Sequence, residues 1–110
     1  MQEDSRKKQR AIERINDLRR KVLEFDHVCS GTIGKIMVRC GKSNCRCATD
    51  PDARHGPYFQ WNRMKKGKLA HSTVTKDQVP LIQQAIDNYR AVLKLLRRWE
   101  EESIKSFGVK

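Results

Sequence analysis

The chain has 110 residues, of which 37% are hydrophobic and 34% charged, and its formal net charge is +11. This length predicts a single domain over residues 1–110, and the hydrophobic content is too high for a disordered protein. The apolar runs are too short to cross a bilayer, and no apolar stretch follows the N-terminal residues. We therefore expect no membrane segment and no secretory signal, and we predict a cytoplasmic protein.

The positive charge is concentrated in the middle of the chain. Residues 29–75 carry a net charge of +7, whereas residues 1–28 and 76–110 carry +2 each. The mixed charges of the two flanks are typical of solvated helices. The strong excess of positive charge in residues 29–75 is typical of a surface that binds anions.

A long helix is predicted over residues 5–28. Its apolar residues follow a 4-3-4-3-4 spacing, which places them on one stripe of a helix: Ala11, Ile15, Leu18, Val22, Phe25 and Cys29. The stripe is short for a free-standing coiled coil. Packing on the chain's own domain and pairing with a second copy both remain open.

The middle segment, residues 29–75, has the pattern of three short strands. Thr32–Cys40 alternates apolar and polar residues, Tyr58–Trp61 is rich in aromatics, and Leu69–Thr75 ends in β-branched residues. Lys66-Gly67 is a turn signal between the last two strands. A small antiparallel sheet is the expected result.

A second long helix is predicted over residues 76–105. Thr75 and Gln78 form a capping-box pattern at its start, and Pro80 falls in its first turns. Two apolar stripes give the helix a wide face, which suits contacts with the first helix, the sheet or another subunit. The predicted fold is α+β, in the order helix, three-stranded antiparallel sheet with a zinc loop, and a long C-terminal helix that packs against the first.

A cluster of cysteines precedes a histidine in the middle segment. Cys40, Cys45 and Cys47 lie within eight residues, and His55 follows before Gly-Pro-Tyr. Zinc prefers four thiolate or imidazole ligands in a tetrahedron, and cysteines in a cytoplasmic chain favour metal over disulfides. The cluster therefore predicts a Zn²⁺ site with these four ligands.

Other ligands compete for the fourth position. Cys29 would make the site all-thiolate, but it also continues the apolar stripe of the first helix. His27 and His71 are the other two histidines of the chain. Reduced thiols without metal are the competing interpretation, and an iron–sulfur cluster is disfavoured because it normally needs four thiolates at familiar spacings.

A zinc with four protein ligands has no open position for a catalytic water, so the predicted metal is structural. The chain shows no catalytic carboxylate pair and no nucleophile–base constellation. The sequence therefore predicts a protein that is not an enzyme and has no catalytic residues.

The run from Val38 to Trp61 resembles a family of small uncharacterised prokaryotic proteins. That family is marked by Cys-Gly-Lys-x-x-Cys-x-Cys followed by His-Gly-Pro-Tyr, which match residues 40–47 and 55–58 here. A basic hairpin and an Asn-Tyr-Arg stretch, here Lys65–Lys68 and Asn88–Arg90, extend the resemblance over residues 31–100. The resemblance implies His55 as a ligand, because histidine belongs to the motif, and it implies an association with mobile elements.

Basic residues interleaved with aromatics suggest nucleic-acid binding. The association with mobile elements that the resemblance implies favours DNA over RNA. The candidate contacts are Lys35, Arg39, Lys42, Arg46, Arg54, Tyr58, Arg63, Lys65, Lys66 and Lys68. Insertion of the hairpin into a duplex groove and stacking of single-stranded bases on the sheet are both compatible with this set. The competing interpretation is that the aromatics form the core and that the cations only surround the metal loop.

The main alternative function is a protein–protein adaptor. In that case the two amphipathic helices would bind a second copy of the chain or another protein, and the metal loop would stiffen the sheet. Neutralising Lys65, Lys66 and Lys68 separates the two functions, since it impairs only a nucleic-acid binder.

Overall fold

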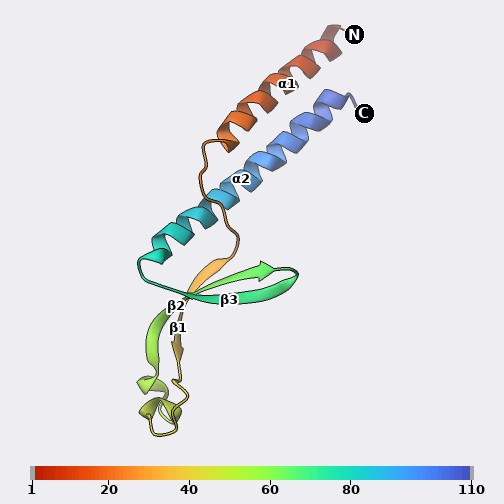
Figure 1. Ribbon diagram of the computed structural model, residues 1–110. Helices are drawn as coiled ribbons and strands as arrows, with labels where there is room; N and C mark the ends of the chain where they lie inside the picture. The colour runs from red at the N-terminus through yellow and green to blue at the C-terminus, as the bar shows by residue number, and fades with distance from the viewer. Residues whose placement is uncertain (1, 110) are drawn as a thin grey trace. The chain divides into compact units, whose positions relative to one another are not determined.

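The computed structural model describes residues 2–109 and confirms the predicted α+β order (Figure 1). Its elements are α1 (Gln2–Val22), β1 (Thr32–Val38), the short 3₁₀ helices η1 (Arg46–Ala48) and η2 (Pro51–Ala53), β2 (His55–Lys65), β3 (Lys68–Val74) and α2 (Gln78–Phe107). In the part of the chain that the structure describes, neither long helix combines the length and apolar character needed to cross a membrane.

The chain forms two compact units. The helical unit contains the described residues up to Val28 and from Asp87 onward, and the sheet unit contains residues 29–86. Helix α2 contributes its first turns to the sheet unit and the rest to the helical unit. The prediction that residues 1–110 fold as a single domain stays a prediction.

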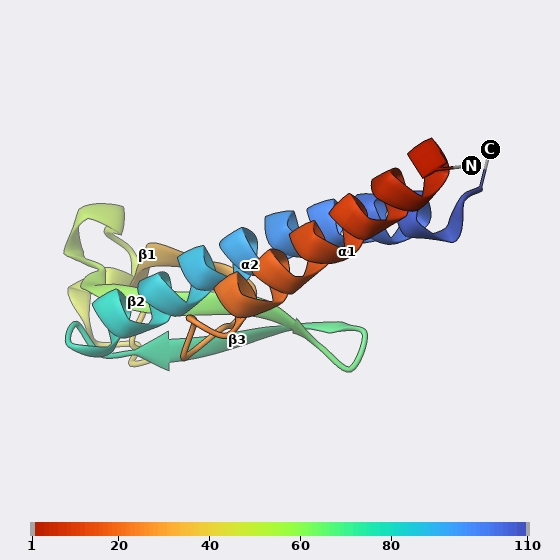
Figure 2. The same ribbon diagram turned by 90° about the horizontal axis from the view of Figure 1, so that it is seen from above.

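In the helical unit, α1 and the C-terminal part of α2 lie side by side and antiparallel, as both ribbon views show (Figures 1 and 2). The predicted stripe of α1 supplies the contact, because Ala11 and Leu18 are buried. An ion pair of 3.4 Å joins Arg14 Nη1 to Glu102 Oε2 across the two helices. The packing of the C-terminal helix against the first is thereby confirmed.

Helix α1 ends six residues earlier than predicted, at Val22 instead of residue 28. Beyond it the backbone is held by partners far along the chain. The Asn88 side chain donates to the carbonyl of His27 at 2.9 Å, and the N–H of Cys29 donates to the carbonyl of Ala85 at 3.1 Å. These bonds hold the segment outside helical geometry, although its apolar spacing continues that of the helix.

Helix α2 begins with the predicted capping box. The N–H of Gln78 donates to Thr75 Oγ1 at 3.2 Å, and Gln78 Oε1 accepts from the N–H of Thr75 at 2.8 Å. These reciprocal bonds satisfy two backbone donors at the helix start. The helix spans Gln78–Phe107, so it begins and ends two residues later in the chain than the predicted 76–105.

Replacing Thr75 by alanine is expected to lower the free energy of unfolding by about 1 kcal/mol, because the N–H of Gln78 loses its side-chain acceptor. Urea unfolding followed by circular dichroism measures the change. Thr75→Ser keeps the hydroxyl and is the matched control. Equal loss in both variants would show that the methyl group, rather than the cap, stabilises this end.

The sheet has the order β1-β2-β3 and is antiparallel throughout. Strand β1 ends at Val38, so the predicted extension to Cys40 was wrong. The register shifts between Ile36 and Val38, and residues 39–54 then form the loop between β1 and β2, which is called the metal loop below. Strand β2 is much longer than the predicted Tyr58–Trp61, since it pairs with β1 from its first residue and with β3 to its last. Strand β3 ends at Val74, one residue before the predicted end.

The β2–β3 hairpin extends beyond the reach of β1. The last residue of β2 that pairs with β1 is Asn62, and the pairs nearest the turn join only β2 and β3. Lys66 and Gly67 have φ of 51° and 79°, as the two central residues of a type I′ turn require. The end of the hairpin is therefore a free two-stranded ribbon.

The two faces of the sheet differ in exposure. The face that carries Phe59, Trp61 and Arg63 is half-buried at these residues and at their partners on β3, whereas the other face is exposed at Tyr58, at Met64 and at the alternate residues of β3. The indole N–H of Trp61 donates to the carbonyl of Ser30 at 3.0 Å. The first face is thus the inner one.

Candidate metal centre and basic surfaces

The structure brings together the four predicted ligands, Cys40, Cys45, Cys47 and His55. Their ligand atoms all lie within 4.8 Å of one another, so the group could hold a metal ion. Two shorter contacts cross the group: the sulfurs of Cys40 and Cys47 are 3.5 Å apart, and the sulfur of Cys45 is 3.3 Å from His55 Nε2. Three sulfurs and one imidazole nitrogen in such a space match the donor set of a structural zinc.

Local backbone structure places these side chains. The loop folds back through hydrogen bonds from the N–H of Ala48 to the carbonyl of Cys45 (3.0 Å) and from the N–H of Asp50 to the carbonyl of Arg46 (2.9 Å). Asp50 Oδ1 accepts from the N–H of Asp52 at 3.0 Å and so caps η2. The loop thereby returns the chain to His55, the first residue of β2.

Close packing also fixes the approach of His55 to the cysteines. Gly56, the next residue, has φ of 130°, and a Cβ there would lie 2.8 Å from the carbonyl oxygen of Ile36. Only glycine fits this conformation and this approach. The Gly-Pro sequence after His55 is thus part of the local structure that seats the imidazole.

The thiols of the cluster differ in acidity. The backbone N–H of Cys47, followed by the side chains around it, lowers the pKa of the Cys45 thiol to about 6, which favours its thiolate at neutral pH. The backbone N–H of Cys40 lowers the pKa of the Cys47 thiol, but burial and the neighbouring thiols outweigh this bond and raise it overall. A bound cation would favour the thiolate at every position.

The competing fourth ligands lie outside the cluster. The thiol of Cys29 contacts the carbonyl of Ile82 at 3.8 Å, and burial raises its pKa. His71, on β3, has its Nδ1 hydrogen-bonded to Asn62 Oδ1 on β2. His27 lies in the segment after α1, where its carbonyl accepts from Asn88. The geometry favours His55.

Replacing His55 by alanine is expected to weaken zinc binding by more than about a hundred-fold, because His55 is itself a candidate ligand. Replacing even a residue that only hydrogen-bonds to a metal ligand lowers metal affinity by about 10–100-fold. His71→Ala is the control, and its affinity should stay within about three-fold of the wild type. Competition with a chromophoric chelator measures both. If His71→Ala weakened zinc binding more than His55→Ala did, the fourth ligand would be His71 on β3.

Three of the predicted nucleic-acid contacts gather at the tip of the β2–β3 hairpin. Lys65 and Lys68 form its last cross-strand pair, and Lys66 occupies the turn. All three are exposed. Within residues 2–109, no ion pair involves them. Their positive charges are therefore free to meet an external anion.

Four further candidates surround the metal loop. Arg39 and Lys42 line a cleft of about 170 Å³ beside Cys47. Arg46 is held by Asp50 at 3.0 Å, and Arg54 is exposed just before β2. Because three thiolates around a divalent cation leave a net negative charge, cations here also suit the metal site.

The remaining candidates separate onto the two faces of the sheet. Arg63 stacks at 4.0 Å on the ring of Trp61 and donates to Ser72 Oγ at 2.8 Å. Lys35 lies 5.9 Å from the ring of Phe59. Tyr58 is on the opposite face and 42% exposed. The ten candidates thus do not form one surface, and Arg63 serves the inner face.

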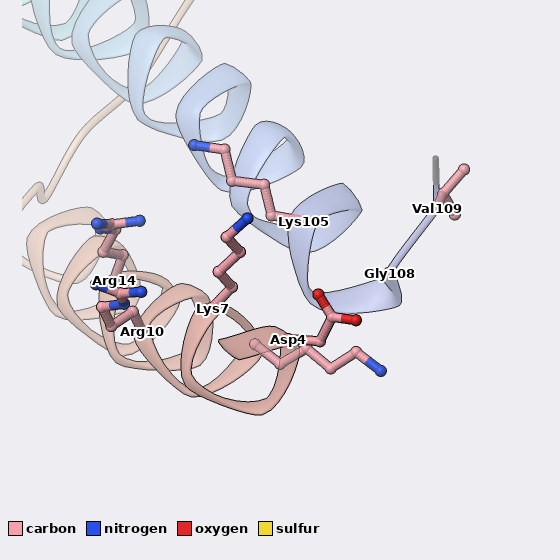
Figure 3. Close-up of a pocket in the computed structure, with 8 residues that line it drawn as sticks. Asp4, Lys7, Arg10, Arg14, Lys105, Gly108 and Val109 are labelled. Carbon is pink, nitrogen blue, oxygen red and sulfur yellow. The ribbon is translucent and has the colours of Figure 1, made fainter. Parts of the chain in front are cut away.

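A second basic surface, which the sequence analysis missed, lies in the helical unit. A cleft of about 450 Å³ between the start of α1 and the end of α2 has five cations and one carboxylate in its lining (Figure 3): Lys7, Lys8, Arg10, Arg14, Lys105 and Asp4. Figure 3 shows Lys7 and Lys105 extending from the two helices into the same space. The basic run at residues 6–10 was the available signal, but the mixed charge of the whole segment obscured it.

The comparisons with known proteins place the chain in a family without assigning an activity. No curated protein and no solved structure matches it. A family model described as "Domain of unknown function (DUF6788)" matches residues 2–84, which include α1, the metal loop and all three strands. The chain therefore belongs to the DUF6788 family, a domain of unknown function.

Proposed function

We propose that the protein is a small zinc-stabilised DNA-binding protein. The observation that carries this proposal is the β2–β3 hairpin, whose tip presents Lys65, Lys66 and Lys68 on a ribbon that β1 does not cover. A two-stranded ribbon can enter the major or the minor groove of a duplex, and lysines that meet phosphates release condensed counterions.

Duplex binding is favoured over stacking of unpaired bases because the inner-face aromatics are occupied. Trp61 is covered by Arg63 and donates to Ser30, and Phe59 is half-buried beside Lys35. Tyr58 alone of these aromatics is exposed. Single-strand binders typically use several accessible rings.

The metal in this proposal is a structural Zn²⁺, not a catalytic one. The three thiolates and one imidazole of the cluster would fill all four tetrahedral positions, which leaves none for water. The ion would fix a polar loop that contains little apolar material of its own. We therefore propose a binding protein and no enzymatic activity. The family resemblance carried by residues 40–47 and 55–58 further supports a role as an accessory factor of a mobile element.

Fluorescence anisotropy of the zinc-loaded protein with duplex DNA, single-stranded DNA and RNA of the same sequence tests the proposal. We expect the duplex to bind most tightly, with log K falling against log salt at a slope of about −3 or steeper. Tighter binding of single-stranded DNA or RNA than of the duplex would indicate that the contact lies on the face of the sheet and not at the hairpin tip. Absence of binding at low salt would overturn the DNA-binding function.

A protein–protein adaptor is the second candidate, because the helical unit leaves large apolar side chains exposed. These are Ile12, Leu23, Leu96, Ile104 and Phe107, with exposed fractions from 44% to 83%. A pair of helices buries only part of two amphipathic faces, so a second copy or another protein would cover the rest. If the anisotropy experiment detects no binding of nucleic acid even at low salt, the adaptor would be the better account of the function.

A further inference from the structure

The hairpin tip carries an apolar pair beside its lysines. Met64 on β2 and Leu69 on β3 face each other directly across the strands, and each is 61% exposed. Directly opposed residues project from the same face of a ribbon, and the next pair, Lys65 and Lys68, projects from the other face. The tip is therefore apolar on one face and cationic on the other.

Nothing in the sheet covers this apolar pair. The pairing of β1 stops at Asn62, two residues before Met64, so the pair lies on the free part of the ribbon. Single exposed apolar residues are common and need no explanation. Here, however, two of them are paired on the free part of the ribbon, next in sequence to three lysines that form no ion pair with any residue from 2 to 109.

We propose that Met64 and Leu69 form a wedge that enters between base pairs of duplex DNA, and that the preferred ligand is a duplex that is easily kinked. The inference rests on the DNA-binding function proposed above. Proteins that bind the minor groove and bend DNA insert side chains such as Leu and Met between base steps, while cations nearby contact the duplex. Lysine side chains are long and flexible enough to reach phosphates on either side of the inserted pair.

Duplex DNA fits this tip better than an anionic membrane does. Membrane-surface segments usually place Trp or Phe at the interface and use a long apolar face. The free ribbon, residues 63–70, offers two large apolar side chains, Met64 and Leu69, and no aromatic one. A wedge also predicts which duplex binds best, because mismatched or flexible steps cost least to unstack.

The experiment compares a duplex of about 30 base pairs with the same duplex carrying one central mismatch, both labelled at their ends for energy transfer. The wild type is expected to bind the mismatched duplex about ten-fold more tightly and to shorten the end-to-end distance of both. In the double variant M64A/L69A the preference should fall to within about two-fold and the bend should disappear, while the salt dependence remains.

The matched control is L23A/L81A, which removes two other exposed leucines, 83% and 72% exposed, at positions that do not belong to the hairpin. It should keep both the preference and the bend. If M64A/L69A also keeps both, the wedge is wrong but DNA binding stands. If the wild type binds no duplex, the proposed function itself fails. Binding to phosphatidylglycerol vesicles that depends on Met64 and Leu69, without bending of DNA, would assign the tip to a membrane surface instead.

Discussion

Replacing Cys45 by serine is expected to weaken zinc binding by more than about a hundred-fold and to unfold the loop between β1 and β2. The sulfur of Cys45 contacts His55 in the cluster, so its loss removes one of the four ligands. Replacing a residue that only hydrogen-bonds to a metal ligand already lowers metal affinity by about 10–100-fold. A structural zinc contributes about 10–16 kcal/mol of apparent binding free energy, which exceeds what the polar loop can supply by itself.

Two measurements follow the effect of Cys45→Ser. Chelator competition gives the affinity, and amide hydrogen exchange reports the protection of residues 41–54. Cys29→Ser is the matched control, because Cys29 lies outside the cluster and contacts Ile82 instead; it should bind one zinc per chain with unchanged affinity. The metal site would be refuted by a Cys45→Ser protein that still binds one zinc as tightly as the wild type.

The second large effect is expected from replacing Lys65, Lys66 and Lys68 together by glutamine. Duplex affinity should fall by about a hundred-fold at low salt, for every sequence alike, because phosphate contacts carry no sequence information. The slope of log K against log salt should become less negative by about 3, one for each lost contact. The three side chains are exposed and outside the described ion pairs, so the fold should be unaffected.

The basic cleft of the helical unit provides a control with the same change in net charge. Replacing Lys7, Lys8 and Arg10 by glutamine also removes three positive charges, but from α1 instead of the hairpin. We expect this variant to lose less than about five-fold in affinity, through long-range attraction alone. If it loses more than the hairpin variant, the DNA-binding surface lies on the helices.

The sequence predicted those features that depend on neighbouring residues. The capping box at Thr75 and Gln78 is a local pattern, and it formed as expected. The turn predicted at Lys66-Gly67 is local as well. The proximity of the four candidate ligands could be predicted because Cys40, Cys45 and Cys47 are close in sequence and the motif continues to His55.

The features that escaped prediction depend on contacts between distant residues. Helix α1 ends at Val22 because Cys29 and His27 bond to α2, some 60 residues away, and the apolar spacing of the segment gave no sign of these bonds. The length of β2 depends on pairing with both neighbours. The hydrogen bond from Arg63 to Ser72 on β3, nine residues away, was not anticipated either, since cross-strand pairing is not visible in a linear list of cations.

The most direct test of the central claim is nuclear magnetic resonance mapping of the zinc-loaded protein during titration with duplex DNA. We expect the largest changes in amide chemical shift at Met64–Leu69, with smaller changes around Arg39 and Lys42 and almost none along α1. Shifts confined to α1 and the C-terminal half of α2, or no shifts at all, would contradict the claim that the hairpin of this zinc-stabilised sheet binds DNA.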